Sequence, residues 1–338
     1  MSVKKIFHAN RKTCTLLLKG FVSIFILAWL AYFLQWQELI TILSGVKISW
    51  LLCSIVFIIA SMVISVYKWQ VVLQAQGMQF GYMELWRAYW VGLFFNNFLP
   101  SSIGGDAMRI LWIASICGDT PGATNSVVIE RILATAGMGM VGLLGAILVA
   151  RPNSVVVFLY LALTVISGLL IIVVLGMPFL KWSRENANPV AHFFQRLSVH
   201  SCRLQGNWGK LLQVVLASIV FHISVVAIGF SIFRSLGLNI SVIESIYVIP
   251  LTIAAAMVPI GVNGYGLREG AYIALLGGYG ISSNGAFASS VMFAFLVSMC
   301  SLYGGGVFLM KNPRWGTSRH LCEKDSVEGQ LVPKQGEY

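Results

Sequence analysis

Charged residues are scarce in this sequence: Asp, Glu, Lys and Arg together make up only 10% of its 338 residues. Hydrophobic residues make up 57%, and the mean hydropathy is +0.81. Such a composition excludes an ordinary soluble globular domain. Apolar runs of about 18 residues or more recur along the chain, and each is long enough to cross a bilayer as a helix. The sequence therefore predicts an all-α polytopic membrane protein.

Motifs for nucleotide, metal or hydrolytic chemistry are also missing. The sequence contains no Walker motif, no H-E-x-x-H, no G-x-S-x-G and no D-x-D pair. Its six cysteines include no C-x-x-C pair, so we expect buried side chains or free thiols, not a disulfide or metal framework. We therefore expect no cofactor and no metal, and we favour a transporter over an enzyme.

The few charges are mostly positive, giving a net charge of +11. In a soluble protein this excess would suggest nucleic acid, but in a membrane protein it indicates cytoplasmic loops and contact with anionic headgroups. Basic residues lie in an N-terminal segment (1–15), a loop (178–210) and a polar tail (311–338). We expect all three segments to be cytoplasmic, the tail to be disordered, and no nucleic acid to bind.

Two apolar stretches are interrupted by charged residues, Pro and Gly. Residues 96–109 read NNFLPSSIGGDAMR, and residues 258–269 read VPIGVNGYGLRE. Both follow one frame, P-x4-G-x3-R. Irregular backbone is tolerated at membrane depth only inside protein or beside a water-filled cavity. We therefore expect each break to be the turn of a re-entrant helical hairpin.

The breaks divide the chain into two similar halves, about 16–150 and 154–310, offset by about 160 residues. Each half reads as span, span, broken segment, span. The predicted spans are 16–34, 48–66, 124–150, 154–177, 211–233 and 285–310, and the broken segments are 84–114 and 243–277. With re-entrant hairpins each half crosses three times, so the halves form an inverted repeat in an inner membrane with both termini inside. We expect the first span to be retained and not cleaved as a signal peptide.

Residues at the breaks are the candidates for a binding site. We expect Asp106 to cap the helix after the first break and Arg109 to lie in its first turn, where a cation needs a nearby anion. Arg268 has the equivalent place after the second break. Exposed amides, flexible glycines and an arginine favour a phosphate or carboxylate ligand. The alternative is that each arginine pairs internally, with Asp106, Glu130 or Glu269, and pins its hairpin.

Other polar residues carry two interpretations each. Glu130 forms either an interfacial pair with Arg131 or a contact with Arg109. Asn97, like its neighbour Asn96, either binds a headgroup or satisfies unwound backbone, and His222 is either an interhelical hydrogen-bonding residue or part of a proton relay. Tyr67, Lys68 and Trp69 are expected to be interfacial anchors at the end of the second span. The substrate-binding candidates are thus Arg109, Arg268, Asp106, Glu130, Arg131, Glu269, Asn97 and Asn263, and the candidate hinges are Pro100, Gly104, Gly105, Pro259, Gly264 and Gly266.

Three motifs in order resemble the lysylphosphatidylglycerol synthase transmembrane-domain family: NNFLPSSIGGDAMR, VIERI at 128–132 and VPIGVNGYGLREGAY at 258–272. The resemblance covers about residues 15–310 and implies an inner-membrane protein related to the flippase half of the bifunctional lysyl-phosphatidylglycerol proteins. It places Asp106, Arg109, Glu130, Arg131, Arg268 and Glu269 on the family motifs. Only a short tail follows the last expected span, so we expect a stand-alone member that lacks the soluble aminoacyl-transferase domain.

Three functions follow as hypotheses. The one we favour is a flippase or translocator of an anionic lipid, either a phospholipid or a lipid-linked sugar on polyprenyl phosphate, with the headgroup held between the two hairpins. The second is an intramembrane transferase that uses a lipid-phosphate donor, with Asp106 or Glu130 as general base. The third is a membrane partner subunit of a lipid-modifying enzyme, docked through the 178–210 loop.

Overall fold

The computed structural model describes residues 36–98, 104–176, 189–258 and 264–310, and every regular element there is a helix. The expected first span and the C-terminal tail lie outside these ranges, as do Pro100, Pro259 and Asn263. The helices are α2 (Trp36–Ser44), α3 (Ile48–Ala75), α4 (Tyr82–Phe98), α5 (Gly104–Cys117), α6 (Thr120–Leu148), α7 (Ser154–Gly176), α8 (Pro189–Gln205), α9 (Trp208–Ser235), α10 (Val242–Met257), α11 (Leu267–Gly277) and α12 (Ser283–Met310).

Five of the described helices, α3, α6, α7, α9 and α12, are long and apolar enough to cross a membrane. Their outward faces are apolar as well: Phe158 and Ile172 on α7 are 67% and 66% exposed. Large apolar side chains exposed along a whole helix belong to a surface that faces lipid. The predicted polytopic all-α membrane fold is confirmed.

The helices repeat with an offset of 160 residues. α3 and α9 begin 160 positions apart, and so do α4 and α10. Both α3 and α9 end in the same kind of turn, with Gly77 (φ 81°) and Gly237 (φ 73°) in the left-handed region that glycine adopts at low cost. In each turn the next amide, of Met78 or Leu238, donates to a carbonyl five residues earlier at 2.9 Å. This shared helix ending supports the predicted internal repeat.

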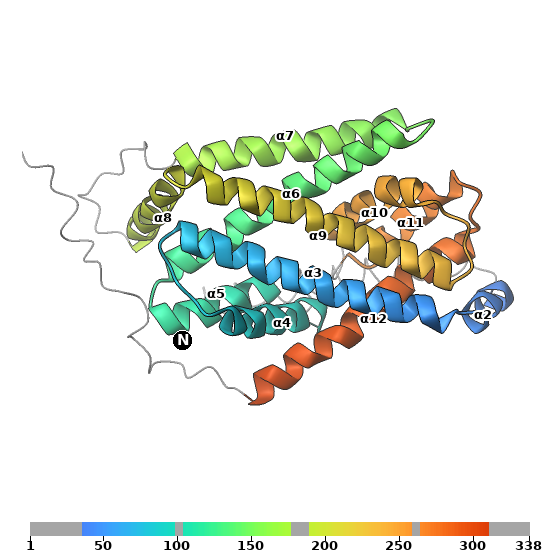
Figure 1. Cartoon of the computed structure of the whole chain (residues 1–338), viewed down its shortest axis with the longest axis horizontal. Helices are drawn as coiled ribbons and strands as arrows, with labels where there is room; N and C mark the ends of the chain where they lie inside the picture. The colour runs from blue at the N-terminus through green and yellow to red at the C-terminus, as the bar shows by residue number, and fades with distance from the viewer. Residues whose placement is uncertain (1–35, 99–103, 177–188, 259–263, 311–338) are drawn as a thin grey trace, which may run out of the picture.

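The equivalent helices α3 and α9 lie side by side and antiparallel (Figure 1). The ammonium of Lys210, near the start of α9, donates to the carbonyl of Gln74 near the end of α3 at 3.1 Å. At the other end, the backbone N–H of Lys47 donates to the carbonyl of Ser235 at 2.9 Å. Each helix start therefore satisfies a free carbonyl at the end of its equivalent. The equivalent helices of the two halves are thus antiparallel, which is the relation that the predicted inverted repeat requires.

Each half also contains a pair of short helices. α4 packs on α5, and α10 packs on α11. These helices have 17, 14, 16 and 11 residues, so each is shorter than the roughly 20 residues that a span needs. The first pair lies toward the left-hand end of the bundle and the second toward the right-hand end (Figure 1). The predicted broken segments are therefore helical hairpins placed toward opposite ends.

Glycine allows the first hairpin to close tightly. A Cβ added to Gly105 on α5 would lie 2.2 Å from the carbonyl oxygen of Gly92 on α4. In the second hairpin Gly264 has a φ of +71°, and a Cβ there would lie 2.4 Å from a carbonyl oxygen of α10. Gly266, with a φ of 90°, precedes the first residue of α11, and Gly104 is the first residue of α5. Of the predicted hinges, Gly105, Gly264 and Gly266 thus have a steric or conformational reason to be glycine.

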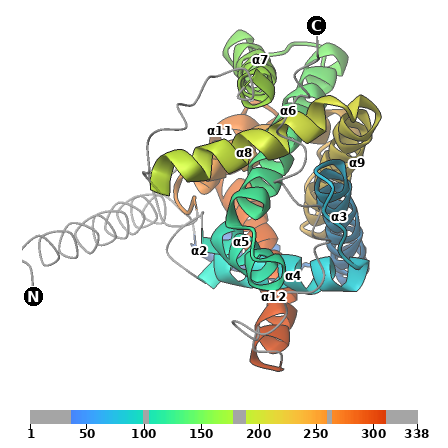
Figure 2. The same cartoon turned by 90° about the vertical axis from the view of Figure 1, so that its left-hand side faces the viewer.

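The 178–210 segment is not a simple loop, because it contains α8. This helix lies across one end of the bundle (Figure 2) and packs against α6, α7 and α9. His200 of α8 lies 2.6 Å from Asp119, whose side chain also accepts the N–H of Gly122 and so caps α6. Burial raises the pKa of Asp119, but the hydrogen bond and charge of His200 outweigh that effect and hold the pKa below its ordinary value of 3.8.

Tyr160 of α7 inserts into the backbone hydrogen-bond ladder of α10. Its hydroxyl donates to the carbonyl of Tyr247 and accepts the N–H of Leu251 at 3.1 Å, and these two backbone groups would otherwise bond to each other. Pro250 lies between them and has no N–H of its own. Tyr160 thus joins α7 to one helix of the second hairpin.

Replacing Tyr160 with phenylalanine should lower the free energy of unfolding by about 1–3 kcal/mol, because the two hydrogen bonds between its hydroxyl group and the backbone of α10 are lost. Thermal or denaturant unfolding of the purified protein in detergent measures the loss. Tyr303→Phe is the matched control: this ring packs on Trp90 and is 51% exposed, so the substitution should change stability by less than about 0.5 kcal/mol. Equal stability of the two variants would contradict the bridging role of Tyr160.

Candidate functional site

Five charged side chains from α3, α5 and α6 form one connected chain. Arg131 donates to both carboxylate oxygens of Asp106, at 2.9 and 2.8 Å, and Arg109 lies 3.3 Å from the same group. Arg109 also donates to Glu130 at 3.2 Å, and the second oxygen of Glu130 accepts from Lys68 at 3.0 Å. The signs alternate from Arg131 to Lys68. With three cations and two carboxylates, the charge chain carries one net positive charge.

Exposure falls steadily along the charge chain. The side chain of Arg131 is 42% exposed and that of Asp106 is 19% exposed, whereas Arg109, Glu130 and Lys68 are exposed by 2% or less. Ionisable groups inside a membrane protein are stable only when they are paired or face a cavity. Glu130 therefore holds two buried cations in place, while Arg131 is the accessible end.

Aromatic rings surround the two deepest cations. The guanidinium carbon of Arg109 lies 4.2 Å from the ring centres of both Trp69 and Tyr89, and the ammonium of Lys68 lies 4.4 Å from the ring centre of Phe221. Such contacts stabilise a desolvated cation by about 2 kcal/mol. Trp69 is fixed in turn because its indole N–H donates to the hydroxyl oxygen of Ser126 at 3.1 Å.

Lys68 and Trp69 do not lie where the sequence predicts. The second span was expected to end at 66 with Lys68 and Trp69 as interfacial anchors, but α3 continues to Ala75 and both side chains are almost fully buried. Tyr67, by contrast, is 44% exposed. The hydropathy falls after residue 66 because the last turns of α3 face other helices and the charge chain. The fall in hydropathy therefore does not mark the end of the helix.

Asp106 also differs from its predicted role. It was expected to cap the helix after the first break, but α5 begins at Gly104, so Asp106 lies inside the first turn and pairs with Arg131 and Arg109. For the same reason Arg109 lies in the second turn of α5 and not in the first, where it was expected. A carboxylate in the first turn still complements the helix dipole. Glu130 and Arg131 do not pair with each other as an interfacial couple; each joins a different partner in the charge chain.

The second hairpin carries a smaller, neutral cluster. Arg268 donates to Glu269 at 2.9 Å, and both side chains bond to the hydroxyl group of Ser290 on α12 at 3.0 Å. Glu269 also accepts the N–H of Gly266 at 2.6 Å and so closes the start of α11. The guanidinium of Arg268 lies 5.1 Å from the ring centre of Tyr265. Arg109 and Arg268 are thus both paired with carboxylates of the protein, as in the alternative that each arginine pins its hairpin. That they also contact a ligand stays a prediction.

The remaining candidates have distinct places. Nε2 of His222 lies 2.9 Å from the carbonyl oxygen of Ala134, so this side chain bridges α9 and α6, in agreement with the first of its two interpretations. Asn97 lies in the last turn of α4, beside the break. The side-chain oxygen of Asn96 is buried without a hydrogen-bond partner among the described residues. Within those same residues no group of three His, Cys, Asp or Glu side chains could hold a metal ion.

The family profile described as "Lysylphosphatidylglycerol synthase TM region" matches residues 16–304 of this sequence. The chain belongs to this family. The match contains the charge chain and the Arg268 cluster, and it supports the resemblance seen in the sequence motifs. A curated relative, "UPF0104 membrane protein PH1989" of Pyrococcus horikoshii, is 20% identical over 332 residues, covering 89% of this chain and 97% of that protein. The family and the apolar helices together establish a multi-pass membrane protein with a lipid-related family role.

Proposed function

We propose that this member of the family is a flippase that moves an anionic lipid between the two leaflets, and that the charge chain receives the phosphate of the headgroup. The observation that carries the proposal is the unbalanced positive charge at membrane depth, with Arg131 accessible at one end. A phosphate that joins the chain would make it neutral and would gain charge-assisted hydrogen bonds from a guanidinium. The membership of a lipid-related family supports a lipid as the source of that phosphate.

The depths of the two polar clusters favour a route across the membrane. Glu130 lies ten residues after the start of α6, about 15 Å inward from the end of the bundle where α8 lies. Ser290, which holds Arg268, lies seven residues after the start of α12, about 10 Å inward from the opposite end. We infer that the two hairpins re-enter the membrane from opposite sides. The two clusters would then receive the headgroup in turn, in the manner of inverted-repeat transporters.

The two clusters would release and bind the headgroup differently. In the first, phosphate competes with Asp106 for Arg131, while Arg109 and Lys68 stay held by Glu130. In the second, Arg268 is balanced by Glu269 and only a displacement of that pair frees it for phosphate. We therefore propose that the first cluster binds the lipid more tightly than the second.

Charge also supports an orientation for the proposed flippase. The 178–210 segment, whose helix α8 lies at one end of the bundle, contains five basic residues in the sequence, compared with Lys47, Arg151 and Arg234 near the opposite end of the described helices. Cytoplasmic loops of membrane proteins carry an excess of Lys and Arg. We propose that the end with α8 faces the cytoplasm of a cell with the protein in its inner membrane, and that the first cluster opens toward the cytoplasmic leaflet.

Transport of a fluorescent phosphatidylglycerol in proteoliposomes tests the function, with dithionite added outside to quench accessible lipid. We expect wild-type protein to expose inner-leaflet lipid and Arg131→Gln to do so about tenfold to a hundredfold more slowly, because one charged hydrogen bond to phosphate is lost. Arg151→Gln, an exposed arginine in the α6–α7 turn, should keep the wild-type rate. An unchanged rate in Arg131→Gln would contradict the proposal, and recovery of a chemically altered lipid would favour an enzyme.

A further inference from the structure

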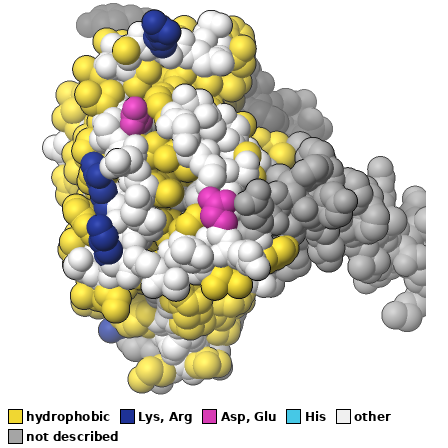
Figure 3. Space-filling view, turned by 90° about the vertical axis from the view of Figure 1, so that its right-hand side faces the viewer, with side chains coloured by type: hydrophobic (Ala, Val, Ile, Leu, Met, Phe, Trp, Pro, Cys, Tyr) yellow, Lys and Arg dark blue, Asp and Glu magenta, His cyan; other side chains and the backbone are white. Residues whose placement is uncertain are grey.

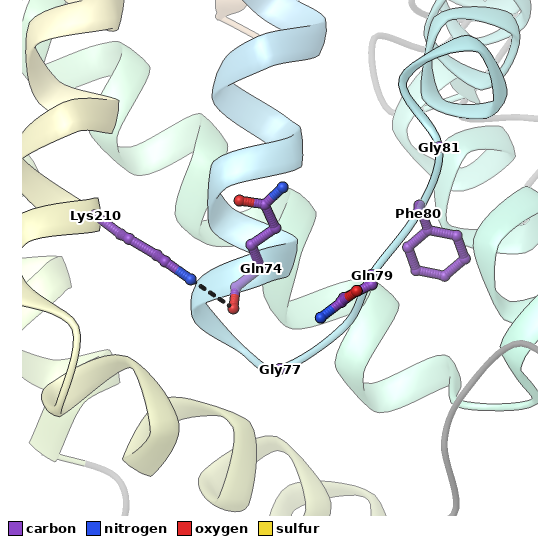
Figure 4. A pocket seen from close by; sticks show the side chains of 6 residues that line it. All are labelled: Gln74, Gly77, Gln79, Phe80, Gly81 and Lys210. Carbon is purple, nitrogen blue, oxygen red and sulfur yellow. Dashed lines mark hydrogen bonds between the residues drawn. The ribbon is translucent and has the colours of Figure 1, made fainter.

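Two pockets lie at opposite ends of the α3–α9 pair. The first has a volume of about 500 Å³ and is lined by Gln74, Gly77, Gln79, Phe80, Gly81 and Lys210 (Figure 4). The second has a volume of about 440 Å³, and its lining includes Lys47, Trp50, Phe230, Arg234 and Asn239. Neither pocket touches the charge chain or the Arg268 cluster, so the function proposed above leaves both unused.

The two pockets occupy equivalent positions in the two halves of the inverted repeat. Each lies between the start of one long helix and the glycine turn that ends the other, with Gly77 in the first lining and Gly237 in the second. The 160-residue offset also relates Gln79 to Asn239. A pseudo-two-fold axis between antiparallel helices places such a pair at opposite faces of the membrane.

Helix length puts both pockets at the depth of lipid headgroups. α3 and α9 have 28 residues each, which corresponds to about 42 Å at 1.5 Å per residue. A bilayer measures about 40–45 Å including its headgroup layers, so both ends of each helix reach those layers. Trp208, the first residue of α9, is 65% exposed, and Trp50 lines the second pocket, as expected where tryptophan lies at the membrane interface.

The lining of both pockets is basic and amide-rich, and no carboxylate is among the lining residues. Lys210 uses one N–H on the Gln74 carbonyl and keeps two for another acceptor. In the second pocket Lys47 is exposed and has no ion-pair partner among the described residues. The guanidinium carbon of Arg234 lies 5.1 Å from the ring centre of Phe230, and Arg234 makes a long 3.5 Å hydrogen bond to Asn239. Figure 3 shows Lys and Arg side chains on the face at this end. Spare cationic donors beside side-chain amides suit a phosphodiester.

Building on the proposed flippase function, we propose that the two pockets are docking sites for the headgroup of an anionic phospholipid, one in each leaflet. The lysine and arginine donors bind the phosphate, the side-chain amides bind the polar headgroup, and the acyl chains stay in the bilayer. Docking at both faces keeps the transported lipid concentrated beside the protein.

A photoactivatable phosphatidylglycerol with a diazirine on its headgroup tests the sites in nanodiscs, with labelled peptides mapped by mass spectrometry. We expect labelling in 74–81 and in 230–239, and little from phosphatidylcholine with the same diazirine. Lys210→Gln should reduce labelling of 74–81 about fivefold, and Lys47→Gln with Arg234→Gln should reduce labelling of 230–239 about thirtyfold, because each basic residue near anionic lipid contributes a factor of about five. Lys210→Arg and Arg151→Gln should label as wild type.

Three results would contradict the proposed docking sites. Labelling could be absent from both segments, it could be unchanged in the Lys210, Lys47 and Arg234 variants, or it could be equal for phosphatidylcholine. Excess inorganic phosphate should leave the labelling intact, and its loss would assign the pockets to a free anion instead of lipid. Arg131→Gln separates this proposal from the flippase function, since it should slow transport and leave the pocket labelling unchanged. If transport depends on Arg131 and the pockets are never labelled, only the docking sites are wrong.

Discussion

Replacing Glu130 with glutamine should lower the free energy of unfolding by about 3–5 kcal/mol, because two buried cations lose their common counter-ion. Lys68 and Arg109 are each exposed by 2% or less, and both pair with this carboxylate. Water cannot reach them to replace the lost charge, and among the described residues Asp106 is the one carboxylate that remains within reach of Arg109. Denaturant unfolding in detergent micelles, followed by the change in tryptophan fluorescence, measures the loss.

Two companion variants make the Glu130 prediction specific. Asp106→Asn should cost about 1 kcal/mol or less, because its main partner Arg131 is 42% exposed and can be solvated. Adding Lys68→Gln to Glu130→Gln should restore part of the loss, because one of the two uncompensated cations is then removed. A Glu130→Gln protein with wild-type stability, or a double variant less stable than the sum of its single variants, would contradict the pairing.

Replacing Gly105 with valine should separate α4 from α5 and cost about 3 kcal/mol or more. The added Cβ would lie 2.2 Å from the backbone oxygen of Gly92 and 2.7 Å from the Cβ of Asn96, and neither atom can move unless the hairpin opens. Because Gly92 also packs on the side chain of Arg109, the same variant should disturb the charge chain. Unfolding in detergent gives the stability change, and the fluorescent-lipid assay gives the transport rate.

A helical glycine with free space around it provides the control for Gly105. Gly168 lies inside α7, and an added Cβ there would meet nothing within 4 Å. Gly168→Ala should therefore stabilise the protein by about 0.5–1 kcal/mol, the ordinary gain of alanine over glycine in a helix. If Gly105→Val were tolerated as well as Gly168→Ala, the close contact between α4 and α5 would not exist in the protein.

The hairpins could be predicted from the sequence because their signal is local. Pro, Gly and Arg stand in the same frame in both halves, and few other features explain such a cluster inside an apolar stretch. The inverted repeat followed from the same two positions together with the charge distribution. α8 was not predicted, because polar residues interrupt its apolar positions and hydropathy averages over them.

The charge chain could be predicted only in part. The contact between Arg109 and Glu130 was one of two interpretations, since both residues fell near the break. Lys68 was missed because it follows an apolar run and adjoins Tyr67 and Trp69, which is also the pattern of an interfacial anchor. The rotation of α3 about its own axis decides whether Lys68 faces the membrane interface or the protein interior, and tertiary packing sets that rotation. The Arg131–Asp106 pair joins residues 25 positions apart and depends in the same way on how α5 packs against α6.

Native mass spectrometry of the protein extracted from its own membrane gives the mass of any lipid that the charge chain retains. We predict a bound phospholipid or polyprenyl-phosphate species in the wild type and its loss in Arg131→Gln, with Arg151→Gln retaining it. The same lipid retained equally by wild type and Arg131→Gln, or no lipid with a phosphate in any preparation, would contradict the claim that the unbalanced positive charge of the charge chain binds an anionic headgroup.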